Sequence, residues 1–147
     1  MSIPIKWFSC WLLVNLKDKA GGIRLNTKSY KDLEIYQLSY ELAMKIHRIS
    51  LLLPKYEQYE EASQIRKSSK GICSCVAEGY GRRRYKNEFI KFLVYAQASC
   101  DETEVHISFI HDSGYINDQD YDSLKDEIDK LGRKINKFIQ YVERNWK

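Results

Sequence analysis

Apolar residues recur at steps of three and four along most of the chain after residue 30. This spacing gathers them on one side of a helix, so it predicts four amphipathic helices, at about 33–53, 57–78, 85–113 and from 117 to the C-terminus. No segment shows the alternation that is typical of a strand. Four such helices with short connections favour an all-α fold, the antiparallel up-and-down four-helix bundle.

Proline, glycine and capping residues mark the predicted helix ends. Asp32 is the expected N-cap of the first helix, and Pro54 forces the chain out of helix after residue 53. Gly79 and Gly81 are expected to end the second helix in the left-handed conformation. Gly114 is expected to stop the third helix in the same way.

The first 29 residues do not fit the helical pattern. They include an apolar run at 7–14 that faintly resembles the hydrophobic region of a signal peptide, but no convincing cleavage site follows it. No run approaches the ~18 apolar residues that cross a bilayer, so we expect no membrane partner. We therefore predict a poorly ordered or atypical extension over 1–29 and a four-helix bundle over 30–147.

The four cysteines, Cys10, Cys73, Cys75 and Cys100, do not form a disulfide framework in a chain of this length. Cys73 and Cys75 are two residues apart, so they point in different directions on a helix and do not suit a zinc site together with Cys100. We interpret the cysteines as reduced thiols in a cytoplasmic protein.

No pattern of catalytic or cofactor-binding residues stands out. His47, His106 and His111 each lack the acidic residue three positions earlier that a di-metal bundle site requires. The Gly79-Tyr80-Gly81 segment lacks the third glycine and the preceding strand of a dinucleotide-binding motif. We therefore expect a binding protein with no metal and no cofactor, and not an enzyme.

Charge is unevenly distributed, although the net charge is only +4. Residues 66–91 hold eight basic and two acidic residues, whereas residues 101–130 hold ten acidic and two basic ones. Arginine forks bind phosphates and tyrosine rings stack on bases, so the three arginines at 82–84, flanked by Tyr80 and Tyr85, fit RNA. The candidate contacts to nucleic acid are Arg66, Lys67, Lys70, Arg82, Arg83, Arg84 and Lys86. The alternatives are a solvated loop, or a loop that pairs with the acidic segment or with an acidic protein.

The second and third helices also carry a family signature. Q-I-R-K-S at 64–68 and I-C-S-C-V-A-E-G-Y-G-R at 72–82 resemble the signature of the four-helix bundle family named for 23S rRNA intervening sequences. The resemblance covers about residues 30–147. Gly71 stands where the family usually has serine, and Cys75 stands where it usually has asparagine. Any family contact made through that asparagine side chain is absent from this chain.

The resemblance implies a homo-oligomer, a pentameric ring, that binds RNA or another polyanion. Some relatives are encoded inside 23S rRNA genes, and a related branch assists the reverse transcriptase of diversity-generating retroelements, so a reverse transcriptase or another protein is a candidate partner. A protein-interaction scaffold, whose basic segment docks an acidic protein surface or the neighbouring subunit, is the alternative. The matched positions expected to have structural roles are Glu78, Gly79, Gly81, Ser99 and Glu102.

Glu78 and Glu102 fall near the predicted inward faces of their helices. A buried carboxylate needs a polar partner. We therefore predict an internal link between Glu102 and either Arg66 or Ser69.

Overall fold

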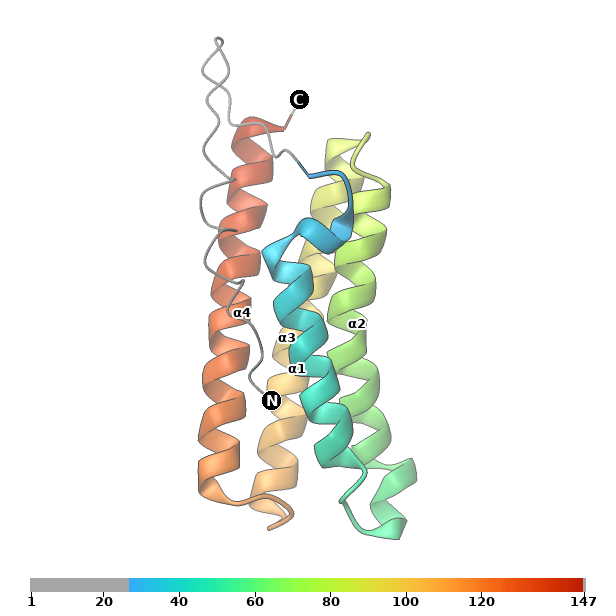
Figure 1. Cartoon of the computed structure of the whole chain (residues 1–147), viewed down its shortest axis with the longest axis vertical. Coiled ribbons are helices and arrows are strands. Elements are labelled where there is room, and N and C mark those ends of the chain that lie inside the picture. The colour runs from blue at the N-terminus through green and yellow to red at the C-terminus, as the bar shows by residue number, and fades with distance from the viewer. Residues whose placement is uncertain (1–26, 147) are drawn as a thin grey trace, which may run out of the picture.

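A computed structural model describes residues 27–146 of the chain. Four helices, α1 (Glu34–Ser50), α2 (Glu61–Gly81), α3 (Lys86–Asp112) and α4 (Asp118–Asn145), run alternately down and up (Figure 1). Two short 3₁₀ helices, η1 (Tyr30–Asp32) and η2 (Lys55–Tyr59), precede α1 and α2. No strand occurs in this part of the chain, and the predicted antiparallel four-helix bundle is confirmed. The predicted extension lies outside the described residues, apart from residues 27–29.

The core is built from the predicted apolar stripes. Burying a side chain the size of leucine or isoleucine contributes roughly 1.5–3 kcal/mol, so these stripes hold the bundle together. The largest fully buried side chains are Leu42 and Ile46 of α1, Ile65 and Ile72 of α2, Phe89, Leu93, Ile107 and Ile110 of α3, and Leu124, Ile128, Leu131 and Ile135 of α4. Each helix therefore contributes one inward face.

Helix α3 packs extensively against both α2 and α4, whereas α1 packs mainly against α2 and more sparsely against α4. The two ends of the bundle are made of different connections. The α2–α3 turn and the C-terminus of α4 share one end, and the α1–α2 and α3–α4 connections share the other (Figure 1). None of the described helices is long and apolar enough to span a membrane.

The start of α1 differs from the prediction. Asp32 does not cap α1 but belongs to η1, where its carboxylate accepts the backbone N–H groups of Lys28 and Ser29, both at 2.9 Å. Leu33 precedes α1 and makes no side-chain cap. The start of α2 is also later than predicted, because the chain after Pro54 first forms η2. One short helix thus precedes each of the first two long ones, with a side-chain cap at η1 and none at η2.

Two of the three glycines predicted to be left-handed at helix ends are not left-handed. Gly114 has a φ of 78°, and its N–H donates to His111 while that of Tyr115 donates to Ile110, so it stops α3 as predicted. Gly79 and Gly81 instead remain right-handed within α2, and the prediction for them was wrong. Gly79 has a packing reason, because a Cβ there would lie 2.9 Å from the Cβ of Phe92. The glycine allows α2 and α3 to approach closely.

Candidate nucleic-acid interface

The α2–α3 connection is a tight turn held by its own backbone. The N–H of Arg82 donates to the carbonyls of Glu78 and Gly79, at 3.1 and 3.0 Å, and the N–H of Tyr85 donates to Arg82 at 2.9 Å. These backbone hydrogen bonds hold the turn in a compact shape. We call residues 82–86, which hold four basic residues and no acidic one, the cationic turn.

The first two arginines of the cationic turn are engaged within the bundle. Arg82 lies 3.0 Å from a Glu78 oxygen and 3.6 Å from a Glu88 oxygen. Arg83 donates to the carbonyl of Tyr80 at 2.8 Å and lies over the Tyr80 ring, 4.0 Å from its centroid. Both guanidinium groups are thus oriented by neighbours, and Arg82 is partly neutralised by two carboxylates.

Arg84 is the exception within the cationic turn. Within residues 27–146 no carboxylate pairs with it, and it is exposed. Its guanidinium lies over the ring of Tyr85, 5.9 Å from the centroid, and that ring is 64% exposed. A free guanidinium beside an accessible aromatic face can bind a phosphate and stack a base at the same place.

Lys86 and the end of α4 brace this turn. The Lys86 ammonium donates to the carbonyl of Glu143, which places a cation against the carbonyl end of α4, where the helix dipole favours it. The indole N–H of Trp146 donates to the carbonyl of Arg83 at 2.8 Å. The turn is therefore also held by the end of α4, in addition to the two helices that it connects.

The predicted basic residues do not form one cluster. Arg66 is sixteen residues before Arg82 on the same helix, a separation of about 24 Å. Its guanidinium is half-buried and donates to Ser50 Oγ at 3.1 Å, and to Oε1 and the backbone carbonyl of Gln58 at 3.2 and 2.9 Å. It therefore ties α2 to the α1–α2 connection. Lys67 and Lys70 are exposed along α2 and stand apart from the turn.

The predicted internal carboxylates are both at the surface. Glu78 pairs with Arg82, and Glu102 has a side chain that is 56% exposed and lies 3.7 Å from His106 Nε2. The predicted link from Glu102 to Arg66 or Ser69 was therefore wrong. One residue of helix turns about 100°, so Glu102 points outward although its neighbour Thr103 is buried.

Two further contacts join α3 to α2, one between polar side chains and one between small residues. His106 Nδ1 lies 2.8 Å from an oxygen of Glu61, which joins α3 to the start of α2. Ser99 lies where α3 approaches α2, and its Oγ would be 3.3 Å from a Cβ placed on Gly71. The structural role expected of Ser99 is thus one of close helix packing. Glu61 is 45 residues from His106 in sequence, so the spacing of residues along one helix does not predict this pair.

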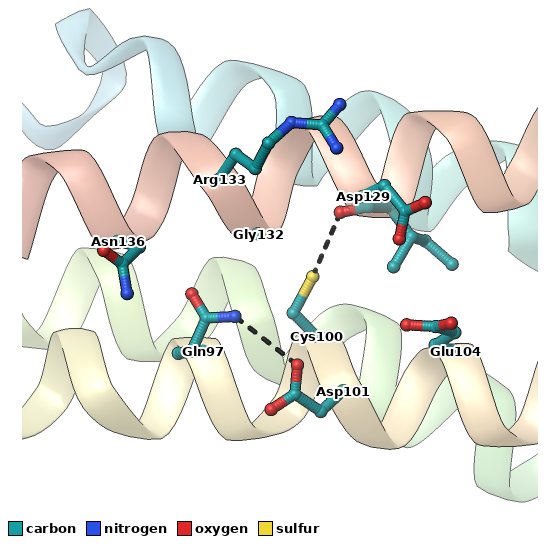
Figure 2. Close-up of a pocket in the computed structure, with 9 residues that line it drawn as sticks. Gln97, Cys100, Asp101, Glu104, Asp129, Gly132, Arg133 and Asn136 are labelled. Carbon is teal, nitrogen blue, oxygen red and sulfur yellow. Dashed lines mark hydrogen bonds between the residues drawn. The ribbon is translucent and has the colours of Figure 1, made fainter.

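A groove of about 320 Å³ lies between α3 and α4 (Figure 2). Cys100 points toward α4 and donates to the carbonyl of Ile128 at 3.6 Å. Burial, together with the nearby carboxylates of Asp101, Glu104 and Asp129, raises the pKa of the Cys100 thiol to about 12. The thiol is therefore protonated at neutral pH, and a neutral thiol is a poor nucleophile.

The acidic residues of this groove are partly neutralised. Lys125 pairs with Glu104 and lies 3.8 Å from Asp129. In the described part of the chain, no group of three or more His, Cys, Asp or Glu residues could hold a metal ion. The groove is thus a packed contact between two helices, with charged side chains along its rim.

The aspartates of residues 112–122 lie at the opposite end of the bundle from the cationic turn. Residues 112–122 hold four aspartates and no lysine or arginine. They begin at the last residue of α3, whose 27 residues span about 40 Å. The cationic turn therefore cannot pair with these aspartates within one subunit, and it remains available to an external anion.

A solved structure supports the fold, and a family profile identifies the family. The chain is similar to the crystal structure of a protein of unknown function from the S23 ribosomal protein family of Bacteroides thetaiotaomicron, with a TM-score of 0.66 and 20% identity. The match covers 72% of this chain and 95% of that one. A comparison with curated proteins finds no match. The profile of the family described as 23S rRNA-intervening sequence protein matches residues 31–137, and the chain belongs to that family.

Proposed function

We propose that this protein acts by binding nucleic acid, RNA in particular, through the cationic turn, and that it does so as a homo-oligomer without catalysis. The observation that carries the proposal is the exposed pair of Arg84 and Tyr85, which has no competing carboxylate among the described residues. One subunit offers few free charges. A homo-oligomer would repeat the turn, so several weak contacts would act together.

The two members of this pair have separable roles. Arg84 supplies charge, and each phosphate contact releases condensed counterions, so its removal should reduce the salt dependence of binding. Tyr85 supplies an uncharged stacking face worth about 1–3 kcal/mol per base, which requires an unpaired base. RNA loops present such bases, whereas an intact duplex does not.

The test is a salt titration of the purified protein against a labelled RNA stem-loop and against duplex DNA. Arg84→Ala should lower affinity and reduce the slope of log K against log salt by about one for each phosphate that the variant no longer binds. Tyr85→Ala should weaken RNA binding at every salt concentration without changing the slope. Lys55→Ala removes a matched charge at the far end of the bundle and should leave binding unchanged. Wild-type affinity and slope in both turn variants would refute the proposal.

A protein-interaction scaffold is the second candidate, because the two ends of the bundle carry opposite charge. Opposite charges favour docking between molecules, or between subunits stacked end to end. Arg84→Ala would then lower the mass of the assembly, measured by light scattering, and the wild-type protein would not bind RNA even at low salt.

A further inference from the structure

The outward face of α3 is unusually apolar. Val94, Tyr95, Val105 and Phe109 are large hydrophobic residues with exposed fractions of 48, 45, 52 and 54%. Together with the exposed Ala98 they recur at helical spacing on the side away from the core, and we call them the outer ridge. The ridge extends over about 23 Å. Exposed large apolar side chains gathered on one helix face mark a contact with another molecule.

The charges on the ridge exclude a symmetrical contact with itself. Asp101 and Glu102 are exposed at its midpoint. A two-fold axis that paired two ridges would set these carboxylates against their own copies, and like charges at an interface are costly. The partner surface must therefore be apolar but rimmed by cations.

The same chain carries such a surface between α1 and α2. A groove of about 300 Å³ is lined by Tyr30, Tyr36, Tyr40, Ala43, Met44 and Lys70. Tyr36 makes an edge contact with Tyr30, with ring centroids 4.8 Å apart, and stacks on Tyr40 at 6.2 Å, so the aromatic wall is braced. Lys70 is exposed at the rim, and Lys67 lies one turn away on the same helix. Within residues 27–146 neither lysine pairs with a carboxylate.

We propose that the outer ridge of one subunit seats in the α1–α2 groove of a second copy, with Glu102 facing Lys70. The inference rests on the homo-oligomer of the proposed function and names its interface. Helices α1 and α3 do not pack extensively on each other, so ridge and groove lie on different sides of the bundle. One subunit can therefore use both surfaces at once. Such a head-to-tail contact closes into a ring when the rotation permits.

The first test places charge on the ridge. Val105→Asp combined with Phe109→Asp should convert the assembly to a monomer of 17.4 kDa, measured by light scattering, with helicity by circular dichroism unchanged. Asn136→Asp combined with Gln140→Asp adds the same charge at exposed positions of α4 and should leave the mass as in the wild type. An assembly that survives the ridge substitutions would overturn the assignment of the ridge.

The second test exchanges the paired charges. Lys70→Glu and Glu102→Lys should each raise the subunit dissociation constant about tenfold or more, and the double variant should recover most of that affinity. If the double variant does not recover subunit affinity, the α1–α2 groove is not the surface that binds the outer ridge. A monomeric wild-type protein would overturn the inference together with the homo-oligomer. The affinity of Arg84→Ala for RNA, measured at wild-type mass, tests nucleic-acid binding separately.

Discussion

Helices α3 and α4 have nearly the same length, yet they use their surfaces differently. Helix α4 buries one stripe, which includes Leu124, Ile128 and Leu131, and its exposed positions are polar or charged. Helix α3 buries an equally regular stripe but also exposes large apolar side chains, such as Val105 and Phe109, on its outer face. A single subunit therefore accounts for the whole sequence of α4 but for only one side of α3.

This difference distinguishes a helix surface that is suited to solvent from one that is suited to contact with another molecule. An outward face that is polar costs nothing in water, so α4 needs no further partner to explain its composition. An outward face that is apolar remains hydrated in the isolated subunit, and hydration of that face is unfavourable. The comparison can be tested by changing the inward faces, the contacts that flank α3, and the joint between the two helices.

The largest expected effect concerns the inward faces, on which the two helices should behave alike. Leu93→Ala in α3 and Leu131→Ala in α4 each remove a side chain with at most 1% exposure. Each should lower the free energy of unfolding by about 2–5 kcal/mol, because the cavity collapses only in part. Urea denaturation measures the change. Lys130→Ala, beside Leu131 but exposed, should stay within about 0.5 kcal/mol. If Leu93→Ala lowers the free energy of unfolding by less than ~1 kcal/mol, α3 does not have a core role equivalent to that of α4.

An intermediate effect should distinguish the two neighbours of α3. Gly79→Ala in α2 places a Cβ 2.9 Å from the Cβ of Phe92, so overpacking should cost about 1–3 kcal/mol. Gly132→Ala in α4 places its Cβ 3.3 Å from Gln97 Nε2, at the tip of a side chain that lines the α3–α4 groove and can move into it. That variant should stabilise the protein by up to about 1 kcal/mol through helix propensity.

Thermal and urea denaturation of the two glycine variants should therefore give changes of opposite sign. Equal destabilisation by both would show that α4 approaches α3 as closely as α2 does. Gly81→Ala is the control, because no atom lies within 4 Å of its added Cβ.

The smallest effect lies at the joint between α3 and α4. Hydrogen bonds to Asp118, at 2.7 Å, and to Asp112, at 3.1 Å, raise the pKa of His111 above its usual value of 6.5. The protonated form is thus favoured in the folded state. Its stabilising contribution is complete below pH 6.5 and is lost as the pH rises through the higher folded pKa.

NMR titration of the His111 ring measures this pKa directly. Asp118→Asn should lower it more than Asp112→Asn, since the bond to Asp118 is the larger cause. An unchanged pKa in Asp118→Asn would show that this contact does not hold the joint.

Much of the fold could be predicted from spacing alone, but the candidate site could be predicted only in part. The inward stripes follow from residues three and four apart, and Gly114 follows from the need for a left-handed residue after α3. The cationic turn was also apparent as a local run of charge. That Arg66 lies apart from the turn was not apparent, because nearness in sequence on one helix still allows about 24 Å of separation.

The composition and periodicity of the sequence determined four helices, their inward faces and a cationic segment that is followed by an acidic one. These are local properties, since each depends on residues within a few turns of one another. The tertiary structure alone decided that Arg66 binds Gln58, that Glu102 faces outward, and that Arg84 and Tyr85 have no carboxylate partner within residues 27–146. These depend on the spacing and rotation of packed helices, which no single helix specifies.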